Sequence, residues 1–204
     1  MSAAHLGRLA AVLAVEPSSL PAGVRALGEA ELAELTDHVS DALHRRDRPR
    51  LEPIVNLVDR LPAQLVAKVA QERFTPRFVA RLAAHLPPTA GSAVIARLDP
   101  KYVADVAAWA ELPRCAPLVA QIPPALVAGA AAHLASGGRW TPMARIAEHL
   151  PDASLAAAFE AISDDAIAAT VAHGRPESGE RALGIIAPSR RPGLADRLAA
   201  AAAA

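Results

Sequence analysis

The sequence predicts an all-α protein, an α-solenoid of short helices that are each about nine residues long and begin about every twelve residues. Three observations lead to this fold class. Hydrophobic residues make up 52% of the 204 residues but aromatic residues only 3%, so the core must be built from Ala, Leu, Val and Ile. A hydrophobe followed closely by proline or by a helix-capping residue recurs along the chain. Between these points, apolar residues recur at helical spacing.

The first 50 residues are expected to form an amino-terminal helical segment. Residues 4–15 predict a short helix and residues 17–23 a linker. The stretch from Glu29 to Arg46 predicts one longer amphipathic helix, whose apolar stripe consists of Leu32, Leu35, Val39 and Leu43. Residues 45–50, with the sequence RRDRPR, are expected to form a basic turn that closes this segment.

Residues 51–174 are expected to form the solenoid. The predicted helix starts are Leu61-Pro62, Phe74-Thr75-Pro76, Leu86-Pro87, Leu98-Asp99-Pro100, Leu112-Pro113, Ile122-Pro123, Trp140-Thr141-Pro142, Leu150-Pro151-Asp152 and Ile162-Ser163-Asp164. Hydroxyl and carboxylate side chains at these starts accept hydrogen bonds from free backbone N–H groups, which predicts N-caps at Thr75, Asp99, Thr141 and Ser163. Proline at the first helical position loses no hydrogen bond, so each proline ends one helix and begins the next.

Each unit carries apolar side chains four residues apart, on one face of its helix. These pairs are Leu65 with Val69, Phe78 with Leu82, Tyr102 with Val106, Leu155 with Phe159, and Ile167 with Val171. A helix this short is marginal alone in water, so neighbouring helices must cover its apolar face. The one long interval contains Ala135–Arg139, which predicts an inserted loop.

Residues 175–204 are expected to form a carboxyl-terminal helical tail. The stretch from Arg175 to Gly179 interrupts the pattern, and a helical segment from Glu180 to Ala187 follows. An alanine-rich end begins at Leu194, and its last residues are expected to fray or be disordered.

The pattern of starts between about Leu57 and Gly174, with alanine-rich helices between them, resembles the amino-terminal cytoplasmic domain of the MgtE-type magnesium transporters. The flagellar motor switch protein FliG is similar in the same respect. The resemblance implies a right-handed superhelix of short helices. It does not extend to magnesium sensing, because acids and bases balance here and Asp164-Asp165 is the only adjacent acidic pair.

Composition excludes several classes of function. The formal net charge is zero, with 21 basic and 21 acidic residues, which gives no overall attraction to nucleic acid or to an anionic membrane. No apolar run reaches the length of about 18 residues that a membrane span needs. The single cysteine, Cys115, rules out an internal disulfide framework and suits a reducing cytoplasm.

No residue pattern specifies catalysis, a cofactor or a metal site. Four histidines lie near the ends of repeats, where cations complement the helix dipole: His85, His133, His149 and His173. Cys115 lies among apolar residues, which is typical of a core cysteine. Asp164 and Asp165 lie at a predicted helix start, which accounts for them structurally.

The candidate interaction residues are Trp109, whose position on its helix is ambiguous, and the arginines of the basic turn, Arg45, Arg46, Arg48 and Arg50. We expect a non-enzymatic cytoplasmic protein-interaction or regulatory module that binds a protein partner. One alternative is a small-ligand-binding protein or enzyme with a pocket between the amino-terminal helices and the solenoid. A second is a HEAT-like nucleic-acid binder, and the balanced charge weighs against this alternative. The sequence specifies no oligomeric state.

Overall fold

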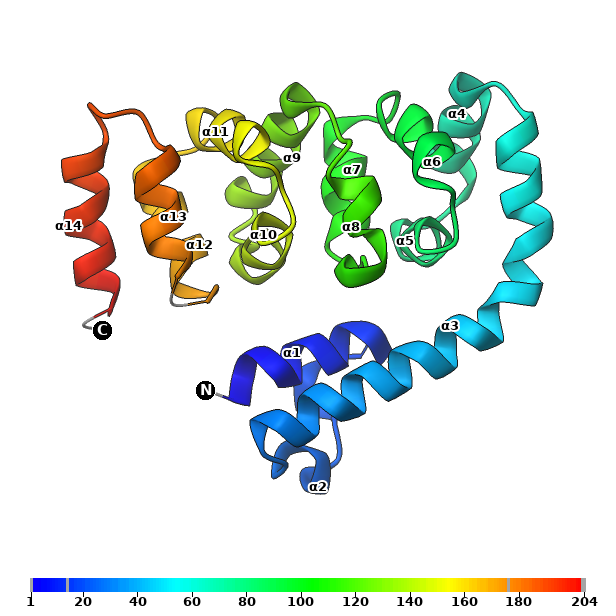
Figure 1. The fold of residues 1–204 in the computed structure, drawn as a ribbon, viewed down its shortest axis with the longest axis horizontal. Helices are drawn as coiled ribbons and strands as arrows, with labels where there is room; N and C mark the ends of the chain where they lie inside the picture. Colours follow the sequence, from blue (N-terminus) through cyan, green and yellow to red (C-terminus); the bar gives the residue numbers. More distant parts are fainter. Residues whose placement is uncertain (1, 14, 176, 203–204) are drawn as a thin grey trace.

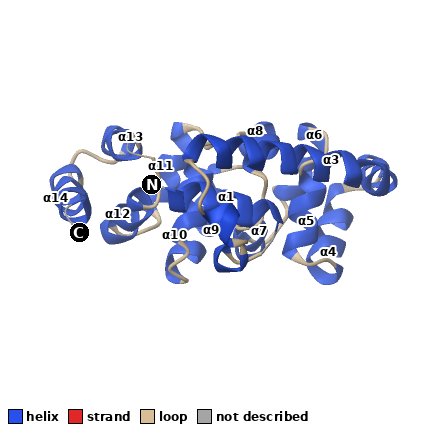
Figure 2. Cartoon of the chain, turned by 90° about the horizontal axis from the view of Figure 1, so that it is seen from below, coloured by secondary structure: helices blue, strands red, loops and turns tan. Residues whose placement is uncertain are grey.

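A computed structural model describes residues 2–13, 15–175 and 177–202 of the chain, and helices are its only regular secondary structure within these ranges (Figure 2). The predicted all-α class is therefore confirmed for the described residues. The helices form two parts: an amino-terminal arm, and a row of short helices that we call the array (Figure 1).

The arm consists of α1 (Ser2–Leu13), the 3-10 turn η1 (Pro17–Ser19), α2 (Ala22–Arg25) and the first half of α3 (Glu29–Arg60). It has a small core of its own, in which Leu9, Ala10, Leu20 and Leu32 are buried. At the start of α3 the Gly28 N–H donates to Glu31 Oε2 over 2.8 Å, which satisfies one free backbone donor.

Helix α3 contradicts the predicted basic turn. It is one helix of 32 residues that runs through residues 45–50 and contains both Pro49 and Pro53. Each proline removes a backbone hydrogen bond and crowds the preceding turn, so the helix bends instead of ending (Figure 1). Buried residues on both sides of the bend hold it in place, among them Asp47 and Leu51. The predicted segment boundary at residue 50 therefore falls inside α3.

The array begins with α4, and its helices are eight to thirteen residues long. Their bounds are α4 (Ala63–Arg73), α5 (Pro76–Ala83), α6 (Pro88–Ile95), α7 (Pro100–Ala107), α8 (Leu112–Val119), α9 (Pro124–Ser136), α10 (Trp140–Ala147), α11 (Asp152–Glu160), α12 (Asp164–Ala172), α13 (Ser178–Ile185) and α14 (Arg191–Ala202).

Most of these helices pack against the second helix after them in the chain. This holds for α4 with α6, α5 with α7, α6 with α8, α7 with α9, α9 with α11, α10 with α12, α11 with α13, and α12 with α14. The predicted tail joins this scheme through α13 and α14, and α14 is helical to Ala202. The terminal alanine run that was expected to fray or be disordered, residues 199–204, is thus helical over its described part, and residues 203–204 lie outside the described residues.

Three of the four predicted N-caps are confirmed. Asp99 Oδ1 accepts from the Lys101 N–H over 2.8 Å, Thr75 Oγ1 from Phe78 over 3.3 Å, and Ser163 Oγ from Ala166 over 3.2 Å. The cap at Thr141 is wrong, because α10 begins one residue earlier, at Trp140. The inserted loop is also shorter than predicted. Helix α9 continues to Ser136, and the chain reverses at Gly138, whose φ of +63° favours glycine.

The main core runs along the array and consists largely of Ala, Leu and Val side chains. Leu155, Phe159 and Ile167 are buried in it as their helical spacing predicts. The pair Leu65 and Val69 contradicts the prediction, because 48% and 38% of these residues are exposed. Helix α4 buries Ala67 and Ala70 instead.

Side chains three helices further along the chain cap the carboxyl ends of several helices. The Tyr102 hydroxyl on α7 lies 2.8 Å from the Ala70 carbonyl oxygen at the end of α4. In the same way, Arg145 on α10 donates to the Ala110 carbonyl after α7, and Arg181 on α13 donates to the Leu150 carbonyl after α10. Arg190, just before α14, donates to the Ile162 carbonyl after α11. These distant donors satisfy carbonyl groups that a helix end leaves free.

The close contact between α7 and α9 yields a stability prediction. A Cβ atom at Gly129 would lie 2.8 Å from Pro100 Cβ, and the proline ring cannot rotate away. We expect Gly129→Ala to lower the free energy of unfolding by about 1–3 kcal/mol in urea denaturation. Gly184→Ala on α13 is the matched control: it meets no atom within 4 Å and should stabilise the protein by about 0.5–1 kcal/mol. Equal stabilisation by both substitutions would contradict the close packing.

Candidate functional site

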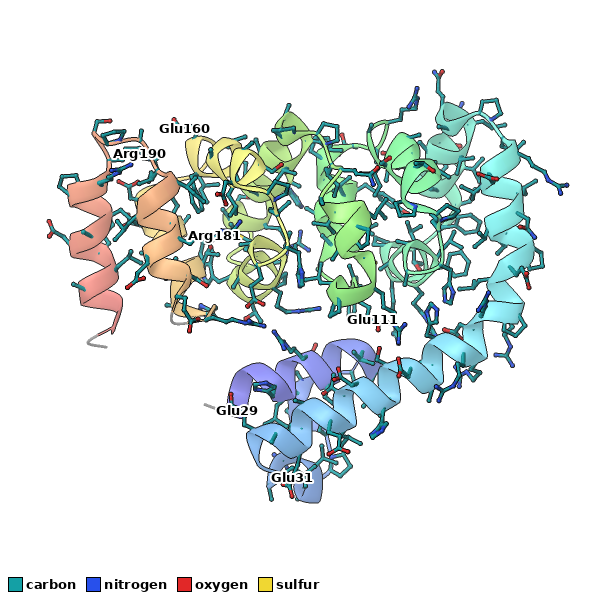
Figure 3. All side chains as sticks on the ribbon, viewed as in Figure 1. Glu29, Glu31, Glu111, Glu160, Arg181 and Arg190 are labelled. Carbon is teal, nitrogen blue, oxygen red and sulfur yellow. The ribbon has the colours of Figure 1, made fainter. Side chains whose placement is uncertain are left out.

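The arm lies alongside the array, and the space between them is the candidate functional site (Figures 1 and 3). Two cavities of about 260 Å³ and 470 Å³ lie there, and residues of both parts line each of them. The two cavities share Val12 from the arm, and Glu111 and Arg145 from the array. We refer to the two together as the arm cleft.

Polar contacts hold the arm against the array. Arg114 on α8 pairs with Asp41 on α3, and its Nε lies 2.6 Å from Glu111 Oε1. Glu111 also accepts a hydrogen bond from the Ser40 hydroxyl, and in Figure 3 its label marks the edge of the array that faces the arm. Charge pairing rather than apolar packing therefore orders this part of the cleft.

Two further ion pairs cross the cleft on either side of this contact. Asp47 on α3 pairs with Arg81 on α5, and Arg8 Nη2 on α1 lies 3.4 Å from Glu148 Oε2. Asp47 is 9% exposed, so its pairing partner compensates a carboxylate that is largely removed from water.

The smaller cavity, which we call the Trp109 cavity, is rich in arginine. Four arginines and two carboxylates line it: Arg46, Arg77, Arg81, Arg145, Asp47 and Glu111. The Arg77 guanidinium lies 5.7 Å from the Trp109 ring centroid, within the range of a cation–π contact. Trp109 itself is 41% exposed. The cavity thus combines a positive surplus with an accessible aromatic face.

The larger cavity, which we call the His149 cavity, has a more balanced lining. Its lining charged or titratable side chains are His5, Arg8, Asp37, Asp41, Glu111, Arg114, Arg145, Glu148 and His149. Burial lowers the pKa of His149, so its ring is neutral over a wider pH range than that of an exposed histidine. Most of the carboxylates here already pair with arginine, as Glu148 does with Arg8 and Arg175.

A pair of stacked histidines also joins the arm to the array. The rings of His44 on α3 and His85 after α5 are 4.0 Å apart and nearly parallel. Burial lowers the pKa of both groups, and the nearby Arg114 guanidinium lowers that of His44 further. Two stacked imidazoles cannot both gain a proton without repulsion, so this contact favours the neutral forms.

The structure brings together some of the residues that the sequence singled out. Trp109 and Arg46 line the same cavity although they are far apart in the chain. Arg45, Arg48 and Arg50 are exposed on α3 and line neither cavity of the cleft. The predicted set of interaction residues therefore does not form one surface.

Several residues of the cleft were not identified from the sequence. Local spacing does not reveal them, because each contacts a partner 30 or more residues away in the chain. These residues are Arg77, Arg81, Arg145 and His44.

The other chemical candidates have structural explanations. Cys115 is 2% exposed, and burial raises the pKa of its thiol to about 12, so it is protonated and a poor nucleophile. Asp164 and Asp165 begin α12 and pair with Arg190 and Arg197. Of the four repeat-end histidines, His173 contacts a carbonyl of its own helix, with Nδ1 2.8 Å from the Ala169 oxygen.

Neither a metal site nor a membrane span was found in the part of the chain that the structure describes. No group of three or more His, Cys, Asp or Glu side chains there is placed to hold a metal ion. Within the same residues, no helix has both the length and the apolarity needed to cross a bilayer.

Inside the array lies a third cavity of about 140 Å³, whose walls are almost entirely apolar. Cys115, Leu118 and Val119 are among its lining residues, and Thr170 is a polar exception. It lies within the array's core and is separate from the charged groups of the cleft.

No known protein family, curated protein or solved structure shows significant similarity to this chain.

The stacked histidines predict that acid weakens the folded protein. Because their folded-state pKa values are lowered below 6.5, their stabilising effect is present above that pH and is lost as the pH falls through 6.5. The stability measured by urea denaturation should thus fall between pH 7.5 and 5.5. The double variant His44→Phe/His85→Phe, which can stack without titrating, should show a smaller fall. His173→Gln, outside the cleft, should behave like the unmodified protein, and an unchanged pH slope in the Phe variant would contradict this assignment.

Proposed function

We propose that this chain is a non-enzymatic cytoplasmic protein-interaction module built on a right-handed α-solenoid. The observation that carries the proposal is a group of exposed apolar side chains where the arm joins the array. This terminal patch consists of Leu57, Leu61, Leu65, Val69 and Phe74.

The terminal patch is unusual for its exposure. Eight large apolar side chains are exposed among the described residues, and five of them lie between positions 57 and 74. Leu57 is 53% exposed and Leu65 48%. From Leu57 to Val69 the apolar residues recur every fourth position, across the junction of α3 and α4. Soluble proteins rarely expose contiguous apolar surface, and where they do it is typical of a protein-binding site.

The packing scheme supports the solenoid part of the proposal. Contacts between most helices and the second one after them, together with caps supplied from three helices away, repeat along the array. Packing in which each helix contacts only helices close to it in the chain is typical of helical repeat proteins. Such proteins bind partners along an extended surface. The resemblance to the superhelical domain of the magnesium transporters supplies the proposed right-handed sense, and magnesium sensing is not part of the proposal.

A second candidate function is the binding of a small molecule in the arm cleft. Its two cavities, of about 260 Å³ and 470 Å³, lie where the sequence analysis placed the alternative pocket. They approach or fall within the size range of small-molecule sites. The nucleic-acid alternative gains less support, since Arg46 and Arg81 already pair with Asp47 and the net charge is zero.

The terminal patch predicts a partner that binds through apolar contacts. A stoichiometric partner should co-purify with the chain from its native host, and Leu65→Ser/Val69→Ser should weaken this complex at least tenfold, or about 1.4 kcal/mol. Both side chains are already exposed, so the free energy of unfolding should change by less than about 1 kcal/mol. Leu13→Ser, at a leucine that is 38% exposed at the end of α1 and lines the Trp109 cavity, is the control outside the terminal patch.

Light scattering after size exclusion, repeated over a range of concentrations, distinguishes a second copy of the chain from a different protein. The proposal is wrong if the chain purifies as a monomer without a partner. It is equally wrong if the Leu65→Ser/Val69→Ser variant and the Leu13→Ser control retain the partner alike.

A further inference from the structure

The arginines that cap distant helix ends do not all have the same partners. Arg181 donates to the carbonyls of Ala147 and Leu150 over 2.9 and 2.7 Å, and its Nη2 also lies 2.8 Å from Asp152 Oδ1. Figure 3 labels this side chain and Arg190, the next of the kind. Each of the two combines helix capping with a charge pair.

Arg190 repeats the arrangement one unit further along. It donates to the carbonyls of Phe159 and Ile162 over 2.7 and 2.9 Å, and its Nη2 lies 2.6 Å from Asp164 Oδ1. In both cases the carboxylate belongs to the first residue of the helix that follows the capped end. Two backbone carbonyls and the aspartate thus surround each guanidinium, and Arg190 Nη1 also lies 4.0 Å from Glu160 Oε1.

Arg145 also caps the carboxyl end of a helix, that of α7, but it has one carbonyl partner and lacks the carboxylate. Its Nη2 donates to the Ala110 carbonyl over 2.9 Å, and no carboxylate among the described residues lies within ion-pair distance of it. Ala110, like Leu150, lies two residues before the next helix. The first residue of that helix is Leu112, a buried apolar side chain where the other two units have aspartate.

Two carboxylates that line the His149 cavity together with Arg145 are already paired. Glu148 pairs with Arg8 and Arg175, and Glu111 with Arg114. Arg145 is partly buried, and burial followed by the nearby Arg8 charge lowers its pKa, while the Glu148 charge acts in the opposite direction. A partly buried charge without an ion-pair partner has a desolvation cost that a counter-ion at this point would offset.

Arg145 lines both the Trp109 cavity and the His149 cavity, which makes it the one arginine common to the two. Arg77 and Trp109 line the first cavity and Arg8 the second. A ligand in either cavity would therefore meet Arg145 together with a second arginine.

We propose that Arg145 binds the carboxylate or phosphate group of a small organic anion held in the arm cleft. The anionic group takes the place beside the guanidinium that Asp152 and Asp164 fill in the two corresponding units further along the array. Arginine suits this role because its planar fork donates two parallel hydrogen bonds to an oxyanion. This site is separate from the terminal patch, so a test of anion binding here is independent of a test of the proposed protein partner.

The test uses the full chain with three probes: inorganic phosphate, succinate and citrate, each compared with chloride at equal ionic strength. Calorimetric titration gives the dissociation constant. The fluorescence of Trp109 in the Trp140→Phe background, where it is the single tryptophan, reports on the cavity. At least one probe should bind saturably with a dissociation constant of about 1 mM or lower. Comparing the dissociation constant of phosphate with those of succinate and citrate shows whether the bound group is a phosphate or a carboxylate.

Two variants separate binding from helix capping. Arg145→Gln keeps an amide that can donate to the Ala110 carbonyl but removes the charge, and it should weaken probe binding at least tenfold. Arg181→Gln makes the same change at the equivalent arginine outside the cleft, so it should lower thermal stability and leave probe affinity unchanged.

Four outcomes would overturn the proposal. One is the absence of saturable binding by all three probes. Another is equal affinity in Arg145→Gln and the unmodified chain. The third is non-saturable stabilisation of every variant by phosphate or citrate, which is the general effect of strongly hydrated salts. A partner protein that supplies an acidic side chain to Arg145 would appear as loss of that complex in Arg145→Gln without any effect on the probes, and this too would contradict a small-molecule site.

Discussion

The structure depends on one constraint, the unsatisfied backbone groups of very short helices. A helix leaves four N–H and four C=O groups without an internal partner at its ends, and in a helix of eight residues these are half of the backbone groups of each kind. Proline removes one donor at the start, and side-chain caps such as that of Asp99 satisfy another. At the carboxyl end, the donors come from three helices away, as Tyr102 and Arg181 illustrate. Each short helix is therefore stable only as part of the row.

The same constraint explains why contacts within the array differ from the contacts that join the arm to the array. Within the array, helices must approach closely to share donors, and small residues such as Ala104 and Ala130 allow this. The arm has its own apolar core and needs no such donors from the array. It is joined to the array by ion pairs, stacked histidines and the continuous helix α3, with polar cavities between them. Charged contacts of this kind are sensitive to pH and to ligands in ways that an apolar core is not.

What the sequence revealed was local. Thr75, Asp99 and Ser163 could be recognised as helix starts because the cap, the following residues and the preceding hydrophobe all lie within a few positions. Pro49 and Pro53 misled the same reasoning, because packing on both sides of a bend can hold a helix together through proline. The outward position of Leu65 depends on what α4 packs against, and periodicity alone does not specify that.

The candidate site was less predictable than the fold for the same reason. A pocket between the amino-terminal helices and the array could be anticipated as an alternative, but its composition could not. Trp109 and Arg46 meet there only because α3 turns beneath the array. The missing carboxylate beside Arg145 becomes visible only when Leu112 is aligned with Asp152 by helix position.

Helix α3 has a mechanical consequence. It belongs to both parts of the molecule and, at 1.5 Å per residue, its 32 residues extend over about 48 Å. A change of about 5° at the bend near Pro49 would displace the start of α3, about 30 Å away, by roughly 2.6 Å. The end of α3 that carries Leu57 lies on the other side of that bend. A small bend in this helix would therefore move the arm by a larger distance than it moves the terminal patch, because the arm lies at the longer end of α3.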